Sequence, residues 1–282
     1  MKLVVSIAVC VLGLNSLLAS DALIEKAKKS GLNAIPTDKV ALIKMIDDKK
    51  DPITKEKVEL GKKLYFDPRM SRSGIISCNT CHNLALGGVD GIPAAIGHGW
   101  TVNPHNLNSP TVYNSVFFKA QFWDGRSHNL AEQAQGPVQA GPEMAAPPAL
   151  VEERINSIPE YVAEFKKVYG NDVKVNFEKI TSTISVFEKT LVTPSRFDKY
   201  LLGDEKALTK DEKEGLNTFI DKGCTTCHTG IALGGTMQPF QVASQYKFTN
   251  VGDFKGDANG MVKTPTLRNI SETAPYFHNG QI

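Results

Sequence analysis

The motif Cys-x-x-Cys-His occurs twice in this chain, and this repetition constrains the fold more than any other feature. The first copy is Cys78-Asn-Thr-Cys81-His82 and the second is Cys224-Thr-Thr-Cys227-His228. In such a motif two thiols can each form a thioether bond to one porphyrin, and the adjacent histidine can then ligate the iron. The sequence therefore predicts two covalently bound haem c groups, one at each copy.

The similarity between the two copies extends beyond the cysteines and histidines. Ser109-Pro-Thr-Val-Tyr-Asn114 resembles Thr264-Pro-Thr-Leu-Arg-Asn269, and Phe122-Trp-Asp-Gly125 resembles Phe277-His-Asn-Gly280. The two matched segments are equally far apart in both copies. Spaced self-similarity of this kind indicates a duplicated structural unit. We therefore expect two cytochrome c-like units, each folded around its own haem.

Two other kinds of site use the same residue types. Two Cys-x-x-Cys pairs can bind zinc, but such pairs usually lie some tens of residues apart, whereas these begin at residues 78 and 224. Each pair could also be a thiol redox centre. The histidine that follows both pairs favours haem over either alternative.

Residues 1–20 have the features of a secretory signal peptide. Lys2 supplies a positive charge, a mostly apolar run follows, and Ala19 and Ser20 are small enough for cleavage. The run is short for a membrane span, although an uncleaved anchor is the alternative. Because bacteria assemble covalent haem c outside the cytoplasmic membrane, we predict a periplasmic protein with no membrane segment after cleavage.

Length, charge and cysteine content agree with this interpretation. The chain has 282 residues, which is long enough for two domains. Its formal net charge of +2 is too small to indicate a nucleic-acid partner. Cys10 lies within the predicted leader, so the four remaining cysteines all belong to the haem motifs and none is left for a structural disulfide.

The fold class is expected to be mainly α, with long loops around the haems and no sustained β alternation. Thr37 is a candidate N-cap for a helix over 38–50, and residues 175–191 carry apolar side chains at helical spacing. Frequent glycine and proline predict loops over 84–148. A helix beginning with a capping box at Thr209 should lead into the second haem motif.

The expected division is an N-terminal haem domain over residues 21–193 and a C-terminal haem domain over 194–282. Pro194 ends the preceding helical pattern and marks the boundary. The second copy stops two residues after Gly280, whereas the first copy continues well past Gly125. The sequence therefore looks like part of a longer chain.

Taken together, the motifs resemble the bacterial dihaem cytochrome c peroxidase family. The resemblance covers roughly residues 55 to 282. Besides both haem motifs, it is carried by Gly97-His-Gly-Trp100, Asn108-Ser-Pro-Thr111, Phe122-Trp-Asp-Gly-Arg126, Gly141-Pro-Glu-Met144, Pro265-Thr-Leu-Arg-Asn-Ile270 and Ala274-Pro-Tyr-Phe-His278.

The resemblance implies reduction of hydrogen peroxide to water by electrons from a small redox protein, either a cytochrome c or a cupredoxin. The N-terminal haem would cleave peroxide and the C-terminal haem would relay electrons. A homodimer is expected from the resemblance alone. The alternatives are a non-enzymatic dihaem electron carrier and a related dihaem oxidase that acts on a protein substrate.

The resemblance also implies roles for single residues around the irons. His82 and His228 would be the proximal ligands, and His98 a detachable sixth ligand of the N-terminal iron. Gln133 and Glu143 would lie over the open iron face, where a carboxylate can act as base and then as acid.

Two further roles come from the same resemblance. Trp123 would lie between the haems, where it could aid electron transfer or serve only in packing. A Ca²⁺ ion would bind between the domains to Asn108 and to the backbone carbonyls of Thr273 and Pro275, an oxygen-only ligand set that suits this cation. The ligand of the second iron opposite His228 has no counterpart in the sequence at the position that the family uses.

Overall fold

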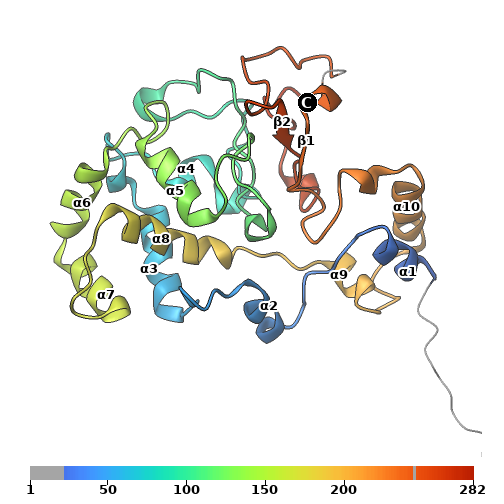
Figure 1. Cartoon of the computed structure of the whole chain (residues 1–282), viewed down its shortest axis with the longest axis horizontal. Coiled ribbons are helices and arrows are strands. Elements are labelled where there is room, and N and C mark those ends of the chain that lie inside the picture. Colours follow the sequence, from blue (N-terminus) through green and yellow to red (C-terminus); the bar gives the residue numbers. More distant parts are fainter. Residues whose placement is uncertain (1–21, 244–245) are drawn as a thin grey trace, which may run out of the picture.

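The computed structural model describes residues 22–243 and 246–282, and its regular structure is mostly helical (Figure 1). The predicted mainly α class is thus confirmed, while the predicted leader and Cys10 lie outside the described residues. The helices are α1 (Ala22–Lys29), α2 (Lys39–Ile46), α3 (Lys55–Phe66), α4 (Cys78–Cys81), α5 (Leu130–Gln139), α6 (Pro148–Asn156), α7 (Pro159–Tyr169), α8 (Phe177–Lys189), α9 (Arg196–Leu201) and α10 (Lys210–Asp221).

A small antiparallel sheet completes the regular structure. Strands β1 (Met237–Pro239) and β2 (Met261–Lys263) pair with Met237 opposite Lys263. Each strand is too short to show an alternating pattern, so the sheet could not be predicted from the sequence. Within the described ranges, no helix is long and apolar enough to cross a bilayer.

Several helices begin and end where local chemistry predicts. The Thr209 hydroxyl accepts from the Glu212 N–H at 3.2 Å, and the Glu212 carboxylate accepts from the Thr209 N–H at 2.8 Å. The capping box at the start of α10 is therefore confirmed. Pro159 opens α7 and so separates it from α6, and α8 covers most of the predicted 175–191 helix.

Two local predictions were wrong. Asp38, and not Thr37, caps α2, because its carboxylate accepts from the Ala41 N–H at 2.8 Å. The region 84–148 also contains α5, which includes Pro137. Asn129 caps this helix, and Leu130, Ala134 and Val138 are buried on one face, so packing outweighs the lost hydrogen bond at proline.

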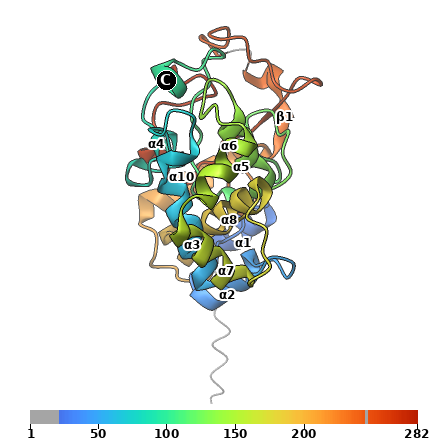
Figure 2. The ribbon, with the colours of Figure 1, turned by 90° about the vertical axis from the view of Figure 1, so that its left-hand side faces the viewer.

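The larger hydrophobic core lies between α3, α6, α7 and α8, on the left in Figure 1 and toward the viewer in Figure 2. Leu60 and Leu64 of α3 face Ile180 and Ile184 of α8, and all four are buried. The two helices approach closely at Gly61, because a Cβ atom there would lie 2.3 Å from the Thr183 carbonyl oxygen. Only glycine permits this approach.

A second, smaller core is formed by α1, α9 and α10 at the opposite end (Figure 1). Ile24 and Ala27 of α1 pack with Tyr200 and Leu216, although the chain between α1 and α9 forms the other core. The division at residues 193 and 194 stays a prediction. Helix α1, the first described helix, therefore packs against the C-terminal half of the chain.

A buried ion pair fixes this packing. Asp198 is fully buried and bonds Arg268 through both carboxylate oxygens, at 2.9 and 3.0 Å. Its Oδ1 atom also accepts from the Ile35 N–H at 2.7 Å. A single carboxylate therefore joins the segment after α1, helix α9 and the loop that follows β2.

The two copies of the duplicated unit have matching backbone conformations. Asn114 and Asn269 hold corresponding positions and both lie in the left-handed region, with φ of 61° and 57°. Phe122 and Phe277 match in the same way, with φ of 66° and 68°. Non-glycine residues seldom adopt positive φ, so this agreement shows that the sequence repeat is also a structural repeat.

The copies meet through reciprocal backbone hydrogen bonds. The Asn108 N–H donates to the His278 carbonyl at 2.8 Å, and the Lys263 N–H donates to the Trp123 carbonyl at 2.7 Å. Asn108 corresponds to Lys263 and Trp123 to His278, so each copy makes the same contact to the other. Thr193 also joins the two copies, because its hydroxyl accepts hydrogen bonds from the side chains of Asn114 and Asn269, at 2.8 and 2.9 Å.

We expect Gly61→Ala to destabilise the protein by about 1–3 kcal/mol, because the added methyl group forces α3 away from α8. The matched control is Gly215→Ala in α10, where a Cβ atom would meet nothing within 4 Å. This control should stabilise the protein by roughly 0.5–1 kcal/mol. Denaturant unfolding measures both changes, and equal effects of the two substitutions would contradict the close approach at Gly61.

Candidate functional site

A cavity of about 750 Å³ opens beside the first Cys-x-x-Cys-His motif. This volume lies within the range of roughly 300–1,000 Å³ that is usual for ligand pockets. Its walls come from α4, α5, α8 and β2, and from the loops that carry the family-like motifs. Among the residues that line it are Cys78, Cys81, His82, Asn108, Trp123, Gln133, Glu143, Glu188 and Lys263.

The two thiols of the first motif are free and are presented on α4. Burial raises the pKa of Cys81 to about 12 and also raises that of Cys78. A thiol redox centre needs a readily formed thiolate, so these pKa values argue against that alternative. The thiols and the adjacent cavity instead fit a porphyrin that is attached at one edge.

His82 has the hydrogen bonding of a metal-ligating histidine. Its Nδ1 atom lies 3.0 Å from the Pro110 carbonyl oxygen. A carbonyl can only accept, so Nδ1 carries the proton and Nε2 keeps a free lone pair. Burial lowers the pKa of His82 and keeps the ring neutral. This arrangement fits an iron ligand whose orientation is fixed by a backbone partner.

His228 repeats this pattern in the second motif. Its Nδ1 atom lies 3.2 Å from the Leu233 carbonyl oxygen, and burial lowers its pKa. Within the described ranges, no three His, Cys, Asp or Glu side chains gather into a possible metal cluster.

Glu143 and Gln133 both line the cavity. Burial raises the pKa of Glu143 above its usual value, and the charge of Arg126 acts in the opposite direction. Gln133 lies on α5, whereas its neighbour Gln135 does not line the cavity. A carboxyl group can act as a base and then as an acid, and the raised pKa of Glu143 favours its protonated form.

His98 is not among the residues that line this cavity. Its backbone N–H donates to the Glu143 carbonyl at 2.7 Å, and a Cβ atom on Gly97 would lie 2.0 Å from the Pro142 carbonyl oxygen. The backbone of the His98 loop is thus packed tightly against the Glu143 loop. The ring Nδ1 atom of His98 is buried and makes no hydrogen bond in the described structure, which is uncommon for a buried polar atom.

Trp123 is buried between the two copies and lines the cavity. Its indole N–H donates to the Asn108 carbonyl at 2.9 Å, and its ring packs edge-on against His278, with 6.4 Å between the ring centres. The structure therefore places Trp123 at the joint between the two haem motifs. The contacts of Trp123 show its packing role, while a role in electron transfer stays a prediction.

Two of the three predicted calcium ligands lie together. The Asn108 side chain contacts the Pro275 carbonyl oxygen at 2.6 Å through its amide nitrogen. A half-turn of the amide would present oxygen in place of nitrogen. Asn108 and Pro275 thus fit an oxygen-only cation site, whereas no described contact brings the Thr273 carbonyl to them.

Two charged residues of the cavity, Glu188 and Lys263, were missed by the sequence reasoning. Glu188 follows Ile184 by one helical turn on α8, so the buried face of this helix could have revealed it. Lys263 occupies the position in the second copy that Asn108 holds in the first. Alignment of the copies was therefore the available signal for Lys263.

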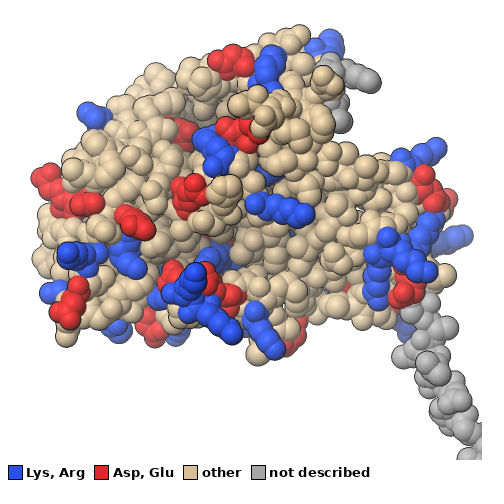
Figure 3. Space-filling view, viewed as in Figure 1, with Lys and Arg blue, Asp and Glu red and all other residues tan. Residues whose placement is uncertain are grey.

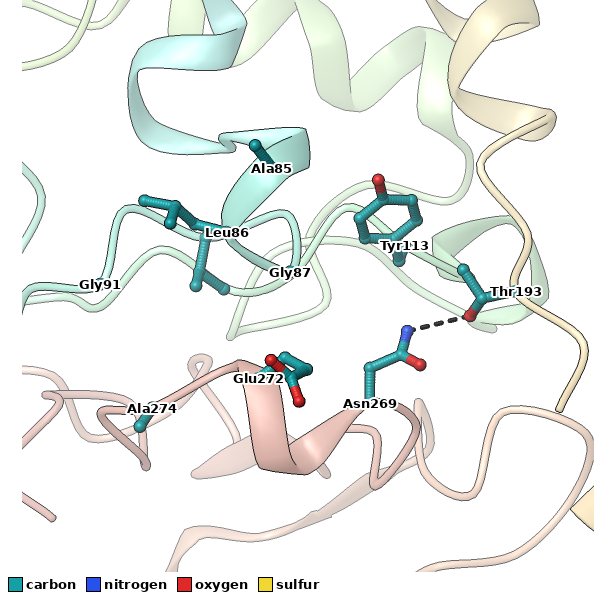
Figure 4. A pocket seen from close by; sticks show the side chains of 10 residues that line it. Ala85, Leu86, Gly87, Gly91, Tyr113, Thr193, Asn269, Glu272 and Ala274 are labelled. Carbon is teal, nitrogen blue, oxygen red and sulfur yellow. Dashed lines mark hydrogen bonds between the residues drawn. The ribbon is translucent and has the colours of Figure 1, made fainter. Parts of the chain in front are cut away.

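A second hollow, of about 460 Å³, lies where the loops of the two copies face each other (Figure 4). Leu86 and Gly87 approach it from the first copy, and Asn269 and Glu272 from the second. The dashed contact in Figure 4 is the Asn269 bond to Thr193. None of the predicted site residues lines this hollow, whose walls come from both copies.

We expect Glu188→Gln to change how stability depends on pH. Burial raises the pKa of Glu188 to about 8 from 4.5, and one carboxylate oxygen has no partner in the described structure. The folded protein therefore binds this proton more tightly than the unfolded chain does. Stability from this group is present below about pH 4.5 and is lost as pH rises through about 8.

Relative to Glu188→Gln, the wild type should lose about 2–5 kcal/mol of unfolding free energy between pH 4.5 and 8. Denaturant unfolding across this range measures the loss. The control is Glu178→Gln, an exposed position on the same helix, which should follow the wild-type pH dependence. A wild-type curve parallel to that of Glu188→Gln would contradict the raised pKa.

Comparison with known proteins agrees with this site. The family model described as di-haem cytochrome c peroxidase matches residues 55–206. Cytochrome c551 peroxidase of Pseudomonas aeruginosa is 48% identical over 245 residues, which cover 82% of this chain and 70% of the relative. The protein of the same name from Nitrosomonas europaea is 48% identical over 237 residues, covering 81% and 70%.

A solved structure supports the fold. The crystal structure of a MauG-like protein associated with microbial copper homeostasis matches with a TM-score of 0.72 and 27% identity. The match covers 83% of this chain and 75% of the other. The duplicated helical architecture is therefore shared with this protein.

Proposed function

This chain belongs to the di-haem cytochrome c peroxidase family, and from that premise we propose that its N-terminal cavity is the place where hydrogen peroxide is reduced to water. Its close relatives are peroxidases, and the family carries two haem groups. The observation that carries the proposal is the convergence of His82, Gln133 and Glu143 on one cavity beside free thiols.

We propose that both haems are attached covalently. Cys78 and Cys81 would hold the first, with His82 Nε2 toward the iron, and the second motif would hold the other in the same way. Bound haem supplies electron transfer and cleavage of the peroxide bond. The protein's task is then to orient the substrate, exclude water and move protons.

Glu143 is the proposed proton carrier. Cleavage of peroxide needs a proton to leave one oxygen and to reach the other, and one carboxylate within hydrogen-bond reach can do both. The raised pKa of Glu143 suits this exchange. Gln133 donates from its amide, which orients the peroxide without competing for the proton.

The contact between the His98 and Glu143 loops supports a gating role for His98. In the described structure the His98 ring stays out of the cavity, while its backbone is bonded to the Glu143 carbonyl. Movement of this loop to bring His98 toward the iron would also act on Glu143. We therefore propose that His98 occupies the resting iron and leaves before peroxide binds.

Electrons would arrive through the C-terminal haem from a small periplasmic cytochrome c or cupredoxin. Trp123, at the joint of the copies, would lie on their path to the first haem. Lysine side chains of α1 and α10 are interspersed with acidic side chains at the right-hand end of Figure 3. The docking surface of the donor and the homodimer both stay predictions.

We expect Glu143→Gln to lower peroxide turnover by about 10²–10⁴-fold while both haems are retained, because the proton carrier is lost. Turnover is followed by oxidation of a reduced cytochrome c or cupredoxin after a pulse of H₂O₂ to half-reduced enzyme. Glu153→Gln, at an exposed position on α6, is the control and should keep full turnover. Wild-type protein that turns over no such donor would contradict the peroxidase proposal.

We expect removal of Ca²⁺ with a chelator to lower both the melting temperature and the turnover of the wild type, and re-addition of Ca²⁺ to restore them. The reason is that Asn108 and Pro275 come from different copies, so the ion would hold the joint together. Asn108→Ala should bind Ca²⁺ at least tenfold more weakly by calorimetry. Unchanged calcium affinity in this variant would exclude Asn108 as a ligand.

A further inference from the structure

Lys263 belongs to the second copy but lies in the cavity of the first. It is the last residue of β2 and is only 4% exposed, and its backbone N–H is bonded to the Trp123 carbonyl. Its side chain lines the same cavity as Cys78 and His82. The positive charge of Lys263 also acts on His82, which places this charge near the proposed iron ligand.

The ammonium group of Lys263 has no counter-ion in the described parts of the chain. It lies 4.7 Å from the centre of the Phe118 ring. Asp124 is the carboxylate whose charge acts on it, but Asp124 is already bonded to Arg126 at 2.8 and 2.9 Å. Burial accordingly lowers the pKa of Lys263 to about 7. A buried, unpaired cation is costly, unless the cavity receives an anion.

Haem itself provides such an anion, because every haem c carries two carboxylate side chains. We propose that Lys263 is the counter-ion of a carboxylate of the haem held by the first motif, so that each half of the duplication contributes to the N-terminal haem site. This inference rests on the haem-binding part of the proposed function and not on peroxide turnover.

The proposal explains an asymmetry between the copies. At the corresponding position the first copy has Asn108, which is neutral and is bonded to the Pro275 carbonyl. At corresponding positions the second copy thus supplies a cation to the first cavity, whereas the first copy has a neutral amide. A nearby positive charge favours the reduced form of a haem, so Lys263 should raise the reduction potential of the N-terminal haem. It acts here as a positioning residue and not as a catalytic one.

Lys263→Met tests this directly, because it keeps the apolar stem and removes the charge. The readout is the midpoint potential of each haem, from a potentiometric titration followed by absorption spectra. We expect the N-terminal reduction equilibrium to shift about tenfold toward the oxidised form, which is about 59 mV lower for a one-electron couple. The C-terminal potential should change much less.

Two further variants separate charge from packing. Lys263→Arg keeps the charge and should hold the N-terminal potential near that of the wild type. Lys119→Met is the matched control, because Lys119 is an exposed lysine next to Phe118 that is not among the residues lining the cavity. This control should leave the N-terminal potential unchanged.

An unchanged N-terminal potential in Lys263→Met would overturn the proposal, and so would equal shifts in Lys263→Met and Lys263→Arg. Pyridine haemochrome analysis first establishes two haems per chain. If Lys263→Met does not hold both haems, Lys263→Gln replaces it under the same criteria. Wild-type protein without two haems would contradict the haem-binding proposal itself, which distinguishes that failure from a failure at Lys263.

Discussion

Two reciprocal backbone hydrogen bonds join the two copies of the duplicated unit beside the cavity. One runs from Asn108 to the His278 carbonyl and the other from Lys263 to the Trp123 carbonyl. Each bond places a side chain of functional interest, because the residues that make them also line or flank the cavity. The Trp123 indole, the Asn108 amide and the Lys263 ammonium are therefore positioned by the joint and not by either copy alone.

Several ionisable side chains of a kind seldom buried in protein cores line the cavity. Glu143, Glu188 and Lys263 are largely buried, and burial shifts the pKa of each toward its neutral form. Such groups cost stability unless a ligand or a reaction uses them. Their meeting in one cavity distinguishes it from the hollow at the joint, where Glu272 is exposed.

The sequence predicts those parts of the fold that depend on local chemistry. The capping box at Thr209 and the apolar face of α8 appear as expected, because each involves residues within a few turns. Gln133, Glu143 and His82 line one cavity, while their roles at the iron stay predictions from the resemblance. Motif spacing and family likeness carry this information without any knowledge of tertiary packing.

Other parts depend on contacts between distant segments. Packing against the larger core stabilises α5 in spite of Pro137, and Ile24 of α1 joins a core shared with Tyr200, Leu201 and Leu216. Lys263 reaches a cavity built mostly from the other copy. No local pattern reports these placements, because each depends on contacts between segments far apart in the sequence.

The reciprocal contacts have the pattern of an isologous interface, in which residue i of one subunit meets residue j of the other and j meets i. Here that pattern occurs within a single polypeptide. In a symmetric dimer of one-haem subunits, any substitution would appear on both sides at once. Fusion into one chain removes this constraint, so that a lysine could arise on one side and an asparagine on the other. Covalent linkage is thus what allows two sites of common origin to differ in charge.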